Sequence, residues 1–184
     1  MHPAALHCIM IGTIQYIGGI GMKKKLLFVV ALLTVSAMAL FAVDPVEGLW
    51  KSVDEEGVAT AFWKIYEKNG VLYGEILKIV GKPDDTIATA AKPSYKNFPL
   101  PGPVNQMKVV GTPWIYGLKK KAPGQWEGGN IIDPGKGDIY SCKITFRPAD
   151  GKKYKNDVLE MRGEIGLGIG RSQYWQRATE AEIK

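Results

Sequence analysis

The sequence contains few of the side chains that most often carry out catalysis at neutral pH. Its 184 residues include only two histidines and two cysteines. His2, His7 and Cys8 all lie in the first eight residues, so Cys142 is the only one of these side chains in the remainder of the chain. Within the remainder, a lone cysteine cannot form a disulfide. Because the remainder has no histidine, it offers no Ser-His-Asp or Cys-His arrangement and no histidine-bearing zinc site.

A secretory signal follows this first stretch. Met22 precedes Lys23–Lys25 and then an apolar run over residues 26–41, which ends in small residues that include Ala39 and Ala42. A charged start, an apolar middle and a small-residue cleavage site are the features of a signal peptide. The alternative is a membrane anchor, but the run is short for a bilayer-spanning helix, which needs about 20 residues. We therefore expect the protein to be exported, and to be periplasmic or secreted.

This signal sets the expected domain organisation. Residues 1–21 are interpreted as a mis-called upstream extension, residues 22–42 as the signal peptide, and residues 43–184 as one domain. Loss of residues 1–42 removes three lysines and no acidic residue, which changes the formal net charge from +6 to +3. The remaining length suits a single hydrophobic core that buries roughly two thirds of the unfolded surface.

Most of the expected domain alternates between apolar and polar residues, which is typical of half-buried strands. In the clearest example, Tyr140, Cys142, Ile144 and Phe146 share one face of a segment. Asn69-Gly70 and several glycine-containing segments between the strands favour tight hairpins. The pattern predicts an all-β fold, a small antiparallel up-and-down barrel of about eight strands. The expected strands are residues 48–53, 60–66, 71–80, 126–133, 139–148, 159–165 and 171–178.

Residues 81–106 do not fit this pattern. The segment contains five prolines, too many for a strand or a long helix. We expect one long proline-rich loop, which could form a lid across one mouth of the barrel.

The inward faces of the predicted strands supply the candidate ligand-binding residues. A barrel of about eight strands has an interior that is either filled by side chains or holds one small ligand. The barrel-lining candidates are Trp63, Ile65, Tyr140, Ile144, Phe146, Leu159 and Met161.

Gly48-Leu49-Trp50 resembles the lipocalin signature, in which a tryptophan seals the closed end of the barrel and an arginine near the C-terminus stacks on it. By that resemblance Trp50 and Arg177 are structural partners. Only six residues follow Ala178, fewer than the helix that lipocalins carry there, so the likeness is to the barrel alone.

A wider resemblance covers residues 48–177. The chain resembles an exported bacterial family known as domain of unknown function 2147, which implies a lipocalin-like barrel in the cell envelope and no established activity. The motifs that carry it are Gly48-Leu49-Trp50, Leu72-Tyr73-Gly74-Glu75-Ile76, residues 126–134, Gly137 with Tyr140, and residues 170–177.

Other motifs have simpler structural explanations. Residues 166–170 are rich in glycine, but a strand rather than a helix is expected after them, so they fit a hairpin better than a phosphate-binding loop. Asp133 and Asp138 are too few and too far apart for a calcium loop. The carboxylates of Glu75, Asp84 and Asp85 show no spacing that indicates acid–base catalysis.

The basic clusters do not indicate a nucleic-acid partner in an exported protein. Lys119–Lys121 and Lys152–Lys153 fit solvated loops, and allow at most a peripheral contact with anionic lipid head groups. Charged residues on the expected outer faces argue against a barrel inserted in the outer membrane. We expect a carrier for a small hydrophobic or amphipathic molecule, with no catalysis, cofactor or metal. The alternative is a structural or protein-interaction module of the cell envelope with a filled barrel.

The first prediction concerns processing. Signal peptidase should cut after Ala42, or as a second choice after Ala39, because both present a small side chain at the cut. Intact-mass measurement of the protein from the cell envelope will identify the new N-terminus. A mature form that retains residues 26–41 would contradict the prediction.

Overall fold

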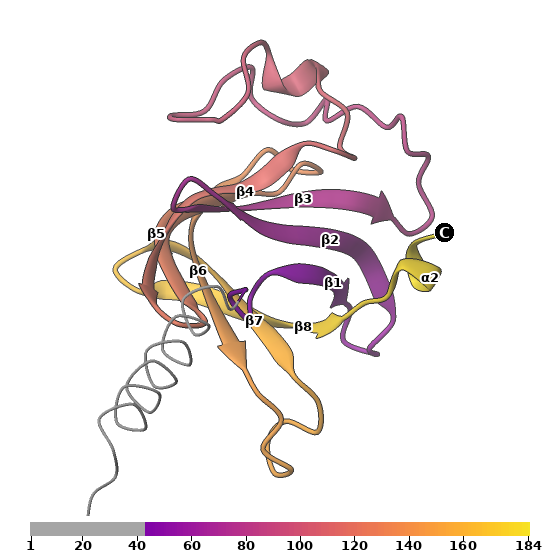
Figure 1. Cartoon of the computed structure of the whole chain (residues 1–184). Helices are drawn as coiled ribbons and strands as arrows, with labels where there is room; N and C mark the ends of the chain where they lie inside the picture. Colours follow the sequence, from indigo (N-terminus) through magenta and orange to yellow (C-terminus); the bar gives the residue numbers. More distant parts are fainter. Residues whose placement is uncertain (1–42) are drawn as a thin grey trace, which may run out of the picture. The chain divides into compact units, whose positions relative to one another are not determined.

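Eight antiparallel strands form a closed barrel in the computed structural model, which describes residues 43–184 (Figure 1). Each strand pairs with the next along the chain, and the last pairs with the first. The all-β up-and-down barrel expected from the sequence is confirmed. The strands are β1 (Gly48–Val53), β2 (Ala59–Lys68), β3 (Val71–Ile79), β4 (Pro113–Ala122), β5 (Gln125–Ile132), β6 (Ile139–Arg147), β7 (Val158–Gly166) and β8 (Ile169–Arg177).

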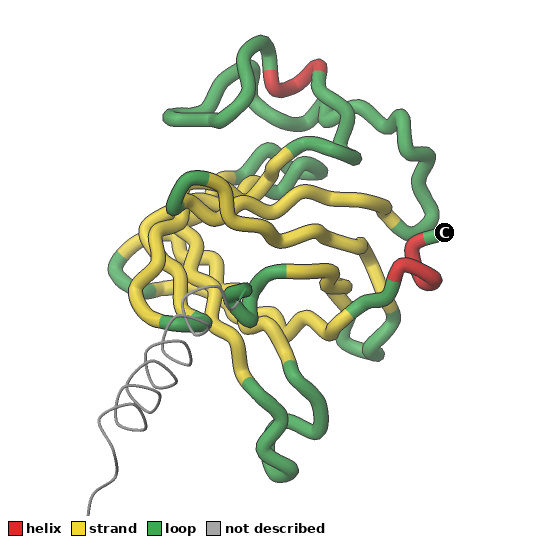
Figure 2. Tube along the Cα trace, in the orientation of Figure 1, coloured by secondary structure: helices red, strands yellow, loops and turns green. Residues whose placement is uncertain are grey.

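Two short helices complete the described chain, a 3-10 helix η2 (Val104–Gln106) and an α-helix α2 (Glu180–Ile183) (Figure 2). Neither helix, nor any other within residues 43–184, is long and apolar enough to cross a membrane. The predicted extension at residues 1–21 and the predicted signal peptide at residues 22–42 lie outside the described residues.

The connections alternate between the two ends of the barrel because every neighbouring pair of strands is antiparallel. The β2–β3, β4–β5 and β6–β7 turns lie at the end where β1 begins, which we call the closed end. The β1–β2, β5–β6 and β7–β8 turns lie at the opposite end, which we call the open end. Asn69 and Gly70 have φ angles of 55° and 75°, the left-handed values that a tight hairpin requires and that this residue pair favours.

Strand β4 is the one strand that the sequence pattern did not predict. Its residues do not alternate in character, because both of its faces are covered. Ile115 and Leu118 belong to the buried core, and Trp114 and Tyr116 are equally buried. The ring of Phe98 packs on both aromatic side chains, with ring centroids 6.2 Å from Trp114 and 5.4 Å from Tyr116.

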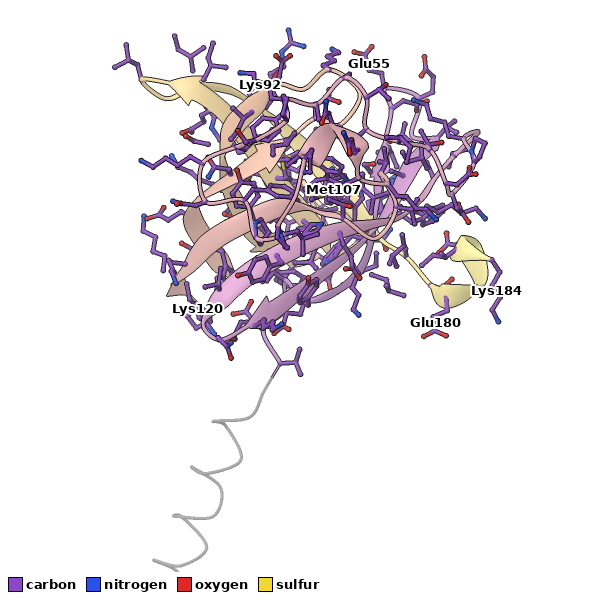
Figure 3. All side chains as sticks on the ribbon, turned by 90° about the horizontal axis from the view of Figure 1, so that it is seen from above. Glu55, Lys92, Met107, Lys120, Glu180 and Lys184 are labelled. Atoms are coloured by element: carbon purple, nitrogen blue, oxygen red, sulfur yellow. The ribbon has the colours of Figure 1, made fainter. Side chains whose placement is uncertain are left out.

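Phe98 belongs to the proline-rich loop, which covers β4. The hydroxyl of Tyr116 donates to the carbonyl of Lys96 at 3.3 Å, and the indole of Trp114 donates to the carbonyl of Val109 at 2.8 Å. In Figure 1 the loop lies above β3 and β4, and in the view from above it lies in front of them (Figure 3). The loop also reaches the open end, where the hydroxyl of Tyr95 donates to the carbonyl of Gly137 in the β5–β6 turn at 2.8 Å, and a lid across the mouth stays a prediction.

The closed end is sealed by Trp50 and Arg177. Trp50 is fully buried, its indole donates to the carbonyl of Val46 at 2.8 Å, and the guanidinium carbon of Arg177 lies 3.8 Å from the centre of its ring. The same guanidinium donates to the carbonyls of Pro45 and Glu47 at 2.5 and 2.7 Å. Arg177 thus stacks on Trp50 in the arrangement that the lipocalin resemblance implied.

A short N-terminal hook at residues 43–47 reinforces this end. Asp44 is buried, and its carboxylate accepts hydrogen bonds from the amides of Val46 and Gly124 and forms an ion pair of 2.9 Å with Lys120. Burial alone would raise the pKa of Asp44, but the lysine and the two amides outweigh it, and the pKa lies below its usual value. The hook thereby ties the start of β1 to the β4–β5 turn.

The C-terminal segment, which includes helix α2, accounts for the burial of Phe62 on the outer face of β2. Phe62 is buried although it lies opposite Lys51 and Lys78, which both contact the C-terminal segment. Lys51 forms an ion pair of 2.5 Å with Glu182, and the ammonium of Lys78 donates to the carbonyl of Ile183 at 2.8 Å. The ion pair with Lys51, with hydrogen bonds from Thr179, holds the pKa of Glu182 at about 2. The residues after the barrel thus form a helix of one turn. The sequence analysis expected no lipocalin helix there, and this helix is shorter than the one that lipocalins carry.

The sealed end predicts coupled losses of stability. Trp50→Ala should lower the free energy of unfolding by about 3–5 kcal/mol, because it removes a large buried ring. Arg177→Ala should cost about 2–3 kcal/mol, from one cation–π contact and hydrogen bonds made by a charged group. A double-mutant cycle by chemical denaturation should give a coupling of about 1 kcal/mol or more. Strictly additive losses would contradict the direct contact.

Cys142 supplies a test of the strand register. The thiol is fully buried on the inward face of β6, and burial raises its pKa above the ordinary value. It should therefore react with a bulky maleimide only as fast as the protein unfolds. Mass spectrometry in native and denaturing buffer measures the two rates. Rapid labelling of the native protein would show that the two faces of the strand are exchanged.

Candidate functional site

A cavity of about 710 Å³ opens at the open end of the barrel. Its wall comes from β1, β2 and the consecutive strands β5 to β8, together with the β5–β6 turn. The closed half of the barrel contrasts with it, because side chains such as Trp126, Ile144 and Leu159 pack there without exposed surface. The barrel is therefore filled at one end and hollow at the other.

The deepest part of the cavity wall is aromatic. Trp63 of β2 and Trp175 of β8 stack with ring centroids 4.7 Å apart and an angle of 27° between their planes. Met161 lies on the same wall. Each indole nitrogen has a partner, because Trp63 donates to the hydroxyl of Ser52 at 3.3 Å and Trp175 donates to the amide oxygen of Gln173 at 2.9 Å. The polar atoms of the indoles are satisfied within the protein, so their faces present an apolar surface.

The cavity exists because several of its wall positions have small side chains. Gly163 lies on β7, and Ser52 and Thr60 lie on β1 and β2, the two strands that follow β8 around the barrel. A Cβ atom added at Gly163 would meet only ordinary van der Waals neighbours, the nearest being Cβ of Tyr140 at 3.4 Å. Nothing in the backbone at Gly163 requires glycine, and the missing side chain leaves room in the cavity.

The mouth of the cavity is polar and carries charges of both signs. Arg171, Lys136 and Asp133 all lie on its wall. The carboxylate of Asp133 accepts a hydrogen bond of 2.9 Å from the amide of Gly135, which stabilises the β5–β6 turn. Neither Arg171 nor Lys136 forms an ion pair with a carboxylate of residues 43–184. Two cations are thus free to face a ligand or another surface.

The seven barrel-lining candidates from the sequence divide between the two halves. Trp63, Tyr140 and Met161 line the cavity. The other four lie in the filled half, where Ile65, Ile144 and Leu159 are fully buried and Phe146 packs edge-on against Trp50 at 6.4 Å. All seven were assigned to the inward face, but the sequence pattern did not show their height along the barrel axis.

Several cavity residues were absent from the candidate list. Trp175 falls within the family motif at residues 170–177, and Gly163 falls within the strand expected at residues 159–165. Their positions could have placed both on the inward face. Gly163 follows the inward Met161 by two residues, and Trp175 pairs with the inward Leu159 across the β7–β8 ladder. Arg171 and Gln173 also line the cavity; they alternate onto the same face of β8 as Trp175, but their polar side chains give no apolar signal of an inward position.

The charged residues weighed for catalysis lie apart from the cavity. Glu75 faces Lys64 at 3.9 Å, and neither Asp84 nor Asp85 belongs to the cavity wall. Among residues 43–184 there is no group of three or more His, Cys, Asp or Glu side chains that could hold a metal ion. The chemistry that the cavity offers is therefore apolar contact, aromatic stacking and charge at the mouth.

Comparison with known proteins identifies the family and supports the fold. The fold is similar to a solved structure described as "Protein HP1028 from the human pathogen Helicobacter pylori belongs to the lipocalin family". The two have 17% sequence identity and a TM-score of 0.57, and the match covers 74% of this chain and 85% of that chain. No curated protein matches the chain. The family described as "Uncharacterized protein conserved in bacteria (DUF2147)" matches residues 48–177. The chain belongs to this family of bacterial proteins, and its barrel is lipocalin-like.

Proposed function

We propose that the protein is an exported carrier that binds one small hydrophobic or amphipathic molecule in the open half of its barrel, without catalysis. The observation that carries the proposal is the cavity with the stacked Trp63 and Trp175 on its wall. Its volume of about 710 Å³ falls in the range of about 300–1,000 Å³ that is typical of small-molecule sites. The periplasmic or secreted location rests on the signal peptide expected at residues 22–42.

The distribution of polarity in the cavity supports an elongated ligand with one polar end. The stacked indoles and Met161 offer an apolar surface away from the mouth. Arg171 and Lys136 lie on the wall without a carboxylate partner in the described part of the chain. Burial of apolar ligand surface is worth roughly 25 cal/mol per Å², and this gain drives binding. The two cations favour a ligand whose polar end is anionic, because opposite charges attract each other.

The second candidate function is a structural or protein-interaction module. It is favoured by the filled half of the barrel, where Trp50, Trp126, Ile144 and Leu159 pack without exposed surface. In that function the cavity would be an unused space and the loops would make the contacts. The two functions differ in whether a small molecule stabilises the native protein.

The carrier function predicts a guest that accompanies the purified protein. Native mass spectrometry of protein isolated from the cell envelope should show an added mass, and solvent extraction should release it. Fatty acids and apolar dyes should raise the melting temperature, since a ligand at 100 times its Kd stabilises by about 2.7 kcal/mol. If no guest is found and no member of the panel binds or stabilises, the carrier function fails and the interaction module takes its place.

A variant that fills the cavity provides the matched test. Gly163→Leu should reduce binding by tenfold or more and leave the barrel folded, because a Cβ there meets only ordinary van der Waals neighbours and Gly163 lies on the cavity wall. Thr145→Leu, which adds a leucine to the outer face of the neighbouring strand β6, is the control and should bind as the unmodified protein does. Leu159 is unsuitable for this purpose because it lies in the filled half, where a larger residue would strain the core. Equal binding by Gly163→Leu and the control would place the ligand elsewhere.

A further inference from the structure

The β7–β8 hairpin exposes the most apolar surface of the described chain. Ile165, Leu167 and Ile169 are 72%, 102% and 63% exposed, and glycines separate and follow them from Gly166 to Gly170. Six consecutive residues at the tip therefore have no polar side chain. Scattered exposed hydrophobic residues are ordinary, but a contiguous apolar tip indicates an interaction surface.

The backbone at the tip makes the apolar residue more unusual. Leu167 has a φ of 49°, in the left-handed region that disfavours residues with a large side chain. The only other non-glycine residues with positive φ among residues 43–184 are Asn69 and Asn97, and asparagine tolerates this region well. A leucine at this position gains no packing within the barrel and is strained. Its presence is explained by a contact outside the barrel.

Charge near the hairpin indicates what that contact is. Glu164 forms ion pairs with Lys143 at 3.0 Å and Arg162 at 2.7 Å, which leaves this cluster with one excess positive charge. Arg171, two residues beyond Ile169, adds a second and has no carboxylate partner among residues 43–184. Across the mouth Lys136 also forms no ion pair within residues 43–184, but the β5–β6 turn that carries it includes Asp133 and Asp138, so the net positive charge lies on the hairpin side.

We propose that the β7–β8 hairpin docks the protein on the surface of an anionic phospholipid bilayer, with Leu167 inserted among the lipids and Arg171 at the level of the head groups. Apolar side chains at a tip, bordered by cations, bind such a surface through buried apolar area and electrostatic attraction together. A narrow projecting tip suits a fluid bilayer, which can surround it on every side. Figure 3 shows the hairpin at the end of β7 and β8 projecting beyond the neighbouring strands.

Docking in this way would bring the cavity to the lipid surface. Ile165, Ile169 and Arg171 belong both to the hairpin and to the cavity wall. A molecule that moves between the bilayer and the barrel would then cross a short apolar path instead of water. This consequence rests on the proposed carrier function, whereas the docking itself does not, and the two are tested separately.

The docking test uses protein purified from the cell envelope and vesicles of phosphatidylglycerol with phosphatidylethanolamine, compared with vesicles of phosphatidylcholine. Flotation should show binding to the anionic vesicles, weakened at about 1 M salt, where the Debye length falls to about 3 Å. Leu167→Asn should reduce the partition coefficient about tenfold or more, because it removes the buried apolar side chain. It should not lower the melting temperature, since asparagine is better suited to the backbone at this position.

Three controls separate the contributions. Leu100→Asn alters a leucine in the proline-rich loop that is 41% exposed, and it should bind vesicles within about twofold of the unmodified protein. Arg171→Gln should weaken binding to anionic vesicles and leave weak binding to phosphatidylcholine unchanged. In Leu167→Trp, the new indole should be quenched by acrylamide in solution and protected on vesicles, against a background of five buried native tryptophans.

Two results would overturn the proposal. One is that the unmodified protein fails to bind anionic vesicles, or binds them as well after Leu167→Asn. The other is concentration-dependent self-association without lipid that Leu167→Asn abolishes, because the hairpin would then dock on a second copy of the chain. Ligand binding measured without vesicles should be the same for Leu167→Asn and the unmodified protein, so failure of docking and failure of the carrier function are distinguishable.

Discussion

The contact between Arg177 and Trp50 holds the two ends of the sheet together. Strands β1 and β8 pair only at Trp50 with Arg177 and at Lys51 with Gln176, whereas β6 and β7 pair continuously from Ser141 to Arg147. So short a ladder supplies few backbone hydrogen bonds, and the side chains must compensate. The guanidinium does so by stacking on the indole and by donating to two carbonyls of the N-terminal hook. Closure removes the edges that an open sheet would expose, so the enclosed interior and its cavity depend on this seam.

The two halves of the barrel have separate tasks. Large side chains fill the closed half, where burial of apolar surface and close packing supply stability. In the open half, Gly163, Ser52 and Thr60 leave space on the wall. A cavity costs stability, because the residues that line it lose contacts they would make in a filled core. The sealed end offsets that cost, and the division explains how one small barrel is both stable and hollow without a disulfide.

Much of the fold could be predicted from the sequence, because strands with one face in the core alternate in polarity. Strand β4 could not, since the proline-rich loop buries Trp114 and Tyr116 on its outer face. Phe62 departed from its pattern for the same kind of reason, as the C-terminal segment contacts its neighbours Lys51 and Lys78. Periodicity assigned Ile144, Leu159 and Met161 to the inward face, yet only Met161 reaches the cavity. Alternation specifies a face but not a height, and small residues that create space leave no apolar signal.

Several features at the open end do not favour the stability of an isolated folded domain. They are a cavity, two cations without carboxylate partners, and a leucine exposed at a strained backbone position. Each of these features lowers the stability of the folded barrel or adds nothing to it. A sequence selected for stability alone would lack them, and would have, for example, asparagine at position 167. Their concentration at one end argues that they serve contacts outside the chain. The hairpin and the cavity share wall residues, so a surface that docks the protein and a site that binds a small molecule would operate at the same opening.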